Sequence, residues 1–294
     1  MNRDQLFSRT RSLLDPALTA SKTFAFIGLG SGGARCAEEA ARLGVGQIIL
    51  VDRPGERLEE HNLIRHPLGY SSLGRLKVEA MRDRLLDIHP ACAVEIVKAD
   101  VNVDAQLLAQ VVGAADQVYL CTDTEQSRHA VNLAAVRFGV TMIFAGVFDG
   151  GCGGEVGRVV PGGACYACVA AFLQRSTRAF EPEQISFDYT GTQPQSPPST
   201  AALNLDIAQI ALIQARVGLL TLLGQTDSTA DFSGNYVLFG NRPVAGLFTR
   251  MLESEIWSIP KNPNCLVCRS LELGANRADQ LAGELLAVAT PTAL

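Results

Sequence analysis

The sequence predicts an α/β protein built on a doubly wound, Rossmann-like and mostly parallel sheet, and two observations support that prediction. Short apolar runs alternate with helical patterns through the first half of the chain, which favours a parallel sheet with helices on both faces. The first apolar run also leads into a glycine-rich turn, where Gly28, Gly30 and Gly33 fit the G-x-G-x-x-G fingerprint for nucleotide phosphates. We therefore expect a nucleotide site near the start of the chain.

Strands and helices are expected in strict alternation up to residue 145. The predicted strands are 23–27, 47–51, 93–97, 117–121 and 141–145. The predicted helices are 33–43, 74–88, 104–112 and 125–138. Gly28, Asp52 and Asp123 fall at the ends of three of these strands, where ligands bind to such sheets.

The second half of the chain has a different composition. Residues 150–163 are rich in glycine, 180–200 read as a mobile loop, and 235–240 and 246–257 read as late antiparallel strands. We treat residues 1–294 as a single domain, with a nucleotide-binding half at 1–160 and a second half at 161–294.

The apolar stretch 203–224 is the one candidate for a membrane span. Four polar residues are expected on one side of this helix, namely Asp206, Gln209, Gln214 and Arg216. A lone bilayer span would not carry such a polar stripe, so we interpret the stretch as a core helix.

Composition excludes several classes of function. The net charge is −5 and no long basic run is present, so neither nucleic acid nor a membrane surface is expected as a partner. The N-terminus carries no apolar signal core, and eight cysteines without such a signal indicate a reducing compartment. We therefore expect a cytoplasmic protein.

The residues around the glycine turn favour ATP over a redox cofactor. Asp52 lies 24 residues after Gly28, where a carboxylate can accept hydrogen bonds from ribose hydroxyls. Asn62, Arg65 and Lys77 then supply an amide and two cations suited to a triphosphate. A NAD-dependent oxidoreductase remains an alternative, but it leaves these three residues without a role. Taken singly, each of the three would be an ordinary polar or charged residue on a solvated loop.

Two C-x-x-C pairs predict a metal site. Cys165, Cys168, Cys265 and Cys268 supply four thiolates, the usual ligand set of a structural zinc ion. Because the pairs are distant in sequence, one zinc ion would clamp the C-terminal segment to the nucleotide-binding half. The remaining cysteines are scattered and are expected to be small buried residues, namely Cys36, Cys92, Cys121 and Cys152.

These motifs, in this order, resemble the ThiF/MoeB/HesA family, prokaryotic relatives of ubiquitin-activating enzymes. The resemblance rests on the glycine turn, Asp52, "HNLIRH", "GRLK", "CTD" and the two cysteine pairs, and it runs from about Phe24 to Cys268. It implies an ATP-dependent adenylyltransferase that activates a carboxylate, commonly the C-terminus of a ubiquitin-like or sulfur-carrier protein or of a peptide. It also implies a homodimer with a structural zinc ion.

The resemblance implies a role for each matching residue. Asp52 would bind the ribose, and Asp123 would position Mg²⁺ and the α-phosphate. The phosphates would be held by Asn62, Arg65 and Lys77. Arg9, or alternatively Arg11, would complete the site of the partner subunit.

The chain departs from the family pattern at two places. The family usually has Arg-Gln where this chain has Arg65-His66. The segment from Asp52 to Asn62 is about two residues longer than the commonest form, and it lacks the second acidic residue often found soon after Asp52.

No cysteine lies between Cys168 and Cys265, the region where some family members carry a thioester-forming cysteine. Cys152 is a weak alternative nucleophile, because its glycine neighbours predict a tight loop near a bound substrate tail. The sequence therefore supports adenylation without an evident thioester step. A non-catalytic or heteromeric partner subunit of an activating enzyme remains the other alternative.

Overall fold

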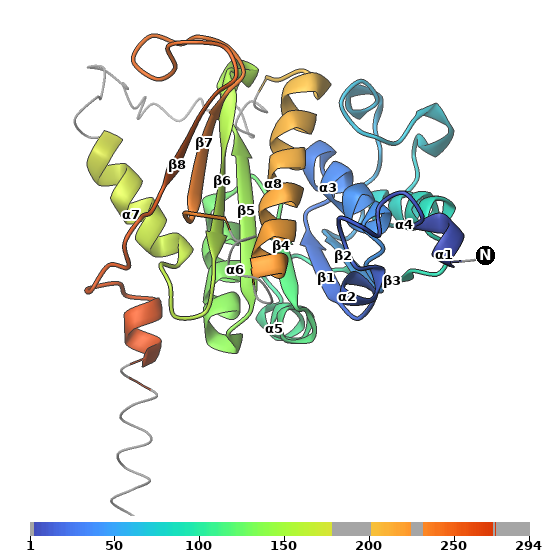
Figure 1. The fold of residues 1–294 in the computed structure, drawn as a ribbon, viewed down its shortest axis with the longest axis horizontal. Coiled ribbons are helices and arrows are strands. Elements are labelled where there is room, and N and C mark those ends of the chain that lie inside the picture. Colours follow the sequence, from blue (N-terminus) through green and yellow to red (C-terminus); the bar gives the residue numbers. More distant parts are fainter. Residues whose placement is uncertain (1–2, 178–200, 225–231, 273, 275–294) are drawn as a thin grey trace, which may run out of the picture.

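One continuous sheet of eight strands forms the centre of the computed structural model, which describes residues 3–177, 201–224, 232–272 and 274 (Figure 1). Its strand order is β3-β2-β1-β4-β5-β6-β7-β8. The first five strands are parallel, and β6, β7 and β8 are antiparallel to their neighbours. The strands are β1 (Thr23–Ile27), β2 (Gln47–Asp52), β3 (Ala93–Lys98), β4 (Gln117–Leu120), β5 (Thr141–Val147), β6 (Gly153–Val159), β7 (Tyr236–Gly240) and β8 (Glu253–Trp257).

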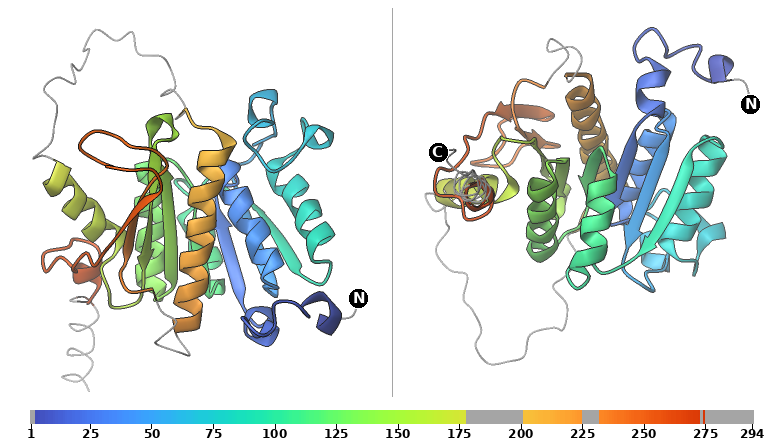
Figure 2. Two further views of the ribbon diagram at one scale, coloured as in Figure 1. Left: turned by 45° about the horizontal axis from the view of Figure 1, so that its top comes forward. Right: turned by 90° about the horizontal axis from the view of Figure 1, so that it is seen from below.

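Helices cover both faces of the parallel part of the sheet (Figure 2). On one face lie α3 (Ser31–Arg42), α4 (Lys77–Ile88) and α8 (Asn204–Gly224). On the other lie α5 (Ala105–Ala114) and α6 (Glu125–Phe138), with α7 (Tyr166–Thr177) beside α6. Two short helices precede β1, namely α1 (Arg3–Leu6) and α2 (Pro16–Ala20). Three 3₁₀ turns lie in connecting segments, η1 (Glu60–Asn62), η2 (Tyr70–Ser72) and η3 (Asp149–Gly151).

The central strands are apolar along their whole length because helices bury both of their faces. In β1, Phe24 and Phe26 pack into the core under α3, α4 and α8. Ala25 and Ile27 pack into the core under α5 and α6. The predicted fold class, the five predicted strands and the four predicted helices of the first half are confirmed, with small shifts at their ends.

The strand order reverses between β1 and β4, and this reversal places the candidate site. From β1 the chain winds outward through β2 to β3, and then returns to the other side of β1 to form β4. The crossovers on the two sides of this point cover opposite faces of the sheet, so a crevice opens beyond the carboxyl ends of β1 and β4. The glycine turn and the "CTD" segment both lie there.

The α8 helix is the one helix in the described part of the chain that is long and apolar enough to cross a membrane by length and composition. It packs against β5, β6 and α3, as expected for a core helix. Its polar residues do not share one environment, however. The buried Gln214 donates hydrogen bonds to the carbonyls of Leu120 (3.2 Å) and Ile143 (3.0 Å), whereas Arg216 is exposed.

The tight loop expected around Cys152 is only partly correct. Gly150 and Gly151 form a turn with positive φ, but Gly153 and Gly154 already belong to β6. The glycines of β6 leave room for residues of neighbouring strands: a Cβ atom on Gly157 would lie 2.1 Å from the ring of Phe144. Close packing against adjacent strands therefore explains these glycines. Because the packing cannot be seen in the sequence, the glycine-rich segment was not predicted to be a strand.

The last predicted strand, 246–257, is too long. Only Glu253–Trp257 pairs with β7. Gly246 and Leu252 both have positive φ, which an extended strand does not allow, so residues 246–252 form turns instead. The predicted loop at 180–200 lies outside the described residues.

A buried ion pair fastens α3 to α4. The carboxylate of Glu38 is fully buried, and it contacts Arg35 Nη1 at 2.9 Å and Arg84 Nε at 2.6 Å. We expect Glu38→Gln to lower the free energy of unfolding by about 2 kcal/mol, because it removes the buried carboxylate that pairs with both guanidinium groups. Urea denaturation measures this change. Glu79→Gln, at the exposed Lys98 pair, is the control and should have a much smaller effect; equal losses in both variants would contradict the assignment.

Candidate active site

A cavity of about 460 Å³ lies at the reversal of strand order, a size ordinary for a small-molecule site. The structure brings together at its wall every residue that was predicted to contact the nucleotide, although they come from four separate segments. They are Gly28, Gly30, Gly33, Asp52, Asn62, Arg65, Lys77 and Asp123.

The glycine turn leaves backbone exposed to the cavity. Gly28 has a φ of +91°, and a Cβ atom on Gly33 would lie 2.1 Å from the carbonyl oxygen of Gly28, so both positions require glycine. Nothing lies within 4 Å of a Cβ atom placed on Gly30, and no side chain caps α3 at this residue. The N-terminus of α3 can therefore receive an anion.

Asp52 is held in place by two backbone N–H groups. Leu29 N–H donates to its Oδ2 atom (3.2 Å) and Arg53 N–H donates to its Oδ1 atom (2.9 Å). Burial raises the pKa of this carboxyl group above its usual value, although these two hydrogen bonds and the charge of Lys77 oppose the shift. Both oxygens keep lone pairs that can accept further hydrogen bonds from a ligand.

Asn62 lies in the segment between β2 and α4, and Lys77 is the first residue of α4. The side-chain carbonyl of Asn62 accepts from Glu59 N–H (3.0 Å), which leaves its amide N–H groups to face the cavity. Lys77 Nζ contacts Glu56 Oε2 at 2.9 Å. Partial burial opposes ionisation of Glu56, but Lys77 and Arg53 outweigh it and lower the pKa of this carboxyl.

Glu56 is a cavity residue that the sequence analysis did not single out. The segment after Asp52 turns through Gly55, whose φ is +86°, and places Glu56 at the cavity wall beside Lys77.

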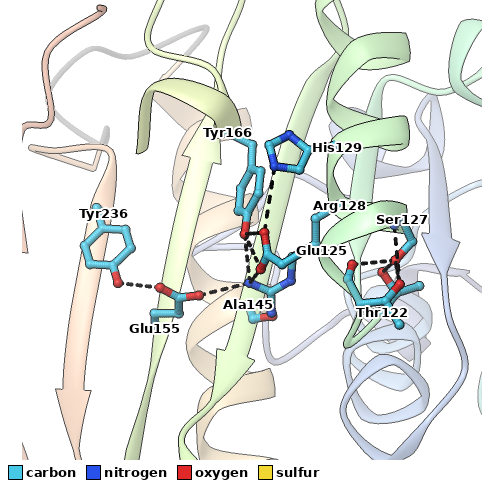
Figure 3. Close-up of polar contacts among 10 residues, drawn as sticks. Thr122, Glu125, Ser127, Arg128, His129, Ala145, Glu155, Tyr166 and Tyr236 are labelled. Atoms are coloured by element: carbon cyan, nitrogen blue, oxygen red, sulfur yellow. Dashed lines mark hydrogen bonds and ion pairs between the residues drawn. The ribbon is translucent and has the colours of Figure 1, made fainter. Parts of the chain in front are cut away.

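Arg128 is a second cavity residue that the sequence analysis missed. Its guanidinium group donates to Glu155 (3.0 Å), Tyr166 Oη (3.3 Å) and the carbonyl of Ala145 (3.1 Å), as Figure 3 shows. Glu155 in turn accepts from Tyr236. The network fixes the carboxyl end of β5 against the first turn of α6. The sequence could have indicated Arg128, because it follows the "CTD" segment within about one and a half helical turns.

Asp123 is exposed at the mouth of the cavity, directly before α6. Its neighbours Thr122 and Thr124 are both bonded to the hydroxyl of the buried Ser127, at 2.6 and 2.7 Å. These contacts, visible in part in Figure 3, hold the backbone on both sides of Asp123 while its carboxylate stays open to a ligand.

The alternative nucleophile and the two arginines predicted to complete the partner subunit's site do not line the cavity. Cys152 is buried and does not line the cavity, and Arg9 and Arg11 are exposed on the turns before α2. Within the described residues, Cys121 is the cysteine on the cavity wall. Burial raises the pKa of its thiol to about 12, so it is protonated and a poor nucleophile at neutral pH.

The two cysteine pairs meet as predicted. All four sulfur atoms lie within 4.8 Å of one another and all four residues are buried. The pairs Cys165–Cys168 (3.8 Å) and Cys165–Cys265 (3.6 Å) match the separation of about 3.8 Å that tetrahedral Zn–S bonds of about 2.3 Å require. Burial opposes ionisation of Cys265, but the N–H groups of Val267 and Cys268 help to lower the pKa of its thiol to about 7. The donor set therefore fits zinc.

His66 joins two parts of the cavity wall. Leu68 N–H donates to its Nδ1 atom (3.2 Å), and its Nε2 atom contacts the carbonyl oxygen of Leu29 at 3.0 Å. The ring must therefore be neutral, with its proton on Nε2. Burial lowers the pKa of His66 to about 4, with Lys77 and Arg35 adding to the shift and Leu29 and Glu38 opposing it.

The fold and the site match a known family. The ThiF family profile matches residues 11–266, and the chain belongs to this family. It is 31% identical over 165 residues to ubiquitin-like modifier-activating enzyme 5 of Caenorhabditis elegans, a stretch that covers 53% of this chain but only 39% of that protein. It is 40% identical over 78 residues to tRNA threonylcarbamoyladenosine dehydratase of Bacillus subtilis, covering 26% of this chain and 30% of that one.

Solved structures of E. coli MccB share the fold. The complex of MccB with ATP has a TM-score of 0.63 at 18% identity, covering 86% of this chain and 68% of MccB. The complex with N-formylated MccA has a TM-score of 0.64 at 19% identity, covering 86% and 69%. At this identity the likeness establishes the architecture.

The low pKa of His66 predicts a pH-dependent stability. Between pH 6.5 and about 4 the unfolded chain binds a proton here that the folded chain does not, so the free energy of unfolding falls as pH falls. From pH 7 to pH 5 this group should account for a loss of about 2 kcal/mol. Urea denaturation at both pH values tests it. In His66→Gln the loss of unfolding free energy between pH 7 and pH 5 should be smaller by this amount. An equal loss in the variant and the wild type would contradict this role of His66.

Proposed function

We propose that the protein is an ATP- and Mg²⁺-dependent adenylyltransferase that activates a carboxylate as an acyl-AMP. The observation that carries the proposal is the cavity itself. It joins an open helix N-terminus, the cations Arg65 and Lys77, and the carboxylates Asp52 and Asp123. The ATP-bound MccB structure, which shares the fold, supports the choice of nucleotide.

Each side of the cavity has its own task in this reaction. Asp52 binds the ribose, the glycine turn receives the phosphates, and Asn62, Arg65 and Lys77 bind the outer phosphates. The substrate carboxylate oxygen attacks the α-phosphorus, the bond from phosphorus to the bridging oxygen breaks, and pyrophosphate leaves with the electron pair. Lys77 leaves its ion pair with Glu56 and pairs with a phosphate group instead. There it stabilises the negative charge that builds up on the leaving pyrophosphate.

Asp123 is the residue proposed to hold Mg²⁺. A bound Mg²⁺ ion neutralises phosphate charge and fixes the phosphate geometry. Asp123 suits this role because its exposed carboxylate stands on a backbone fixed by Thr122, Thr124 and Ser127.

The proposed substrate is the carboxyl terminus of a small ubiquitin-like or sulfur-carrier protein, or of a peptide. Support comes from the ubiquitin-like modifier-activating enzymes among the relatives and from the MccB complex with N-formylated MccA. We further propose a cytoplasmic homodimer in which the exposed Arg9 completes the partner's site. Because Cys121 is protonated and Cys152 is buried away from the cavity, the proposal includes no thioester on either residue.

Carboxylate activation predicts ATP–pyrophosphate exchange that depends on a free C-terminus. Small proteins ending in Gly-Gly and short peptides are each assayed beside the same chain with a C-terminal amide. We expect exchange with at least one free acid and none with its amide, because the amide cannot attack phosphorus. Exchange that is equal for the acid and the amide would contradict the proposal.

One variant tests the metal site in that assay, and a second variant serves as its control. Asp123→Asn should lower exchange about 100-fold, because it weakens the metal that offsets phosphate charge. Asp87→Asn, at an exposed carboxylate on α4, should leave exchange unchanged.

We also propose that the four clustered cysteines bind one structural zinc ion. Cys268→Ser should reduce bound zinc from one ion per chain to a small fraction and lower the melting temperature, because zinc binding supplies folding free energy. Elemental analysis and thermal unfolding measure the two effects. Cys92→Ser, at a buried cysteine outside the cluster, is the matched control; equal zinc content in both variants would refute the site.

A further inference from the structure

The two walls that would hold a triphosphate belong to different elements. One is the glycine turn between β1 and α3, which lies beside Asp52 and would receive the phosphates. The other is the segment between β2 and α4, which carries Asn62 and Arg65. In-line attack at phosphorus needs both walls at a fixed separation, since small displacements of reacting groups cost large factors in rate.

The peptide of Leu29 connects the two walls. Leu29 is fully buried between Gly28 and Gly30, so its own backbone has no access to water. Its N–H group donates to Asp52 (3.2 Å), and its carbonyl oxygen accepts from Nε2 of His66 (3.0 Å). The residue next to His66 is Arg65.

His66 is held on its other side by its own segment. Its Nδ1 atom accepts from Leu68 N–H at 3.2 Å, so the ring bridges the backbone of Leu29 and the backbone just beyond Arg65. The side chain is 94% buried from solvent, with a relative exposure of 6%. Both bonds are made at the cavity wall, whereas the Glu38 ion pair joins α3 to α4.

We propose that His66 is a positioning residue that fixes the Asn62–Arg65 segment against the glycine turn and thereby aligns the outer phosphates of ATP. The inference rests on the proposed function, since it concerns the same nucleotide. His66 itself does not line the cavity and would not touch the phosphates; it acts through Leu29 and Arg65.

The chemistry of the bridge defines which side chains can replace His66. The bridge needs one donor, toward the Leu29 carbonyl, and one acceptor, toward the Leu68 N–H group. A glutamine amide supplies both a donor and an acceptor, so it can replace the imidazole ring in this bridge. Leucine fills a similar volume but supplies neither, so it separates the polar bridge from simple packing.

The test compares the dissociation constants of a non-hydrolysable ATP analogue and of AMP by calorimetry. The wild-type protein, His66→Gln and His66→Leu are titrated with each ligand in the presence of Mg²⁺. We expect His66→Leu to weaken binding of the ATP analogue about tenfold and of AMP less than twofold, because AMP lacks the phosphates that reach Asn62 and Arg65. His66→Gln should retain the wild-type ratio.

Leu85→Ala is the matched control for lost stability, because Leu85 is a fully buried residue of α4 that neither lines the cavity nor contacts the bridge. It should leave the ratio of the two constants unchanged. The inference is overturned if His66→Leu binds the ATP analogue like the wild type, if it weakens both ligands equally, or if His66→Gln behaves like His66→Leu. Wild-type protein that binds neither ligand would instead overturn the proposed function, and the inference with it.

If His66→Leu does not fold, the wild-type protein still decides. The Leu68 amide, bonded to the ring, should be protected from hydrogen exchange at neutral pH and lose that protection as pH falls through about 4. A Leu68 amide that exchanges freely at neutral pH would refute the bridge.

Discussion

The close approach of backbone to backbone at the reversal of strand order is the constraint on which the site depends. Gly28 N–H donates to Val51 O (2.9 Å) and Cys121 N–H donates to Ile27 O (2.8 Å), so three strands end together. A side chain on Gly33 would meet Gly28 at 2.1 Å and the Cβ atom of Cys121 at 2.8 Å. Only glycine lets α3 begin this close to β4, and that closeness leaves its N-terminus pointing into the crevice.

Charges in the cavity are held by protein partners that a nucleotide can replace or join. Lys77 is paired with Glu56, and Asp52 accepts two backbone N–H groups while keeping free lone pairs. Arg128 differs, because Glu155, Tyr166 and Ala145 already occupy most of its donors. Lys77 is thus suited to ligand exchange, whereas Arg128 is suited to keeping the cavity wall rigid.

Sequence sufficed for the features that have a local signal, and failed where the reason lies across the fold. The glycine turn, the "CTD" segment and the cysteine pairs are short motifs, and the structure brings each group together as expected. Strand β6 was hidden because its glycines are dictated by Phe144 and other neighbours distant in sequence. Glu56 was missed because only the fold brings it to Lys77 at the cavity wall. The roles of His66 and Arg128 depend on contacts that only the folded chain creates.

We propose that this cavity binds ATP rather than a redox dinucleotide. Thermal unfolding of the zinc-loaded protein, with ATP plus Mg²⁺ and separately with NAD, tests it most directly. A ligand that binds only the folded state raises the melting temperature in proportion to the logarithm of its excess over the dissociation constant. ATP plus Mg²⁺ should raise the melting temperature and NAD should not; a rise with NAD alone would rule out the ATP site.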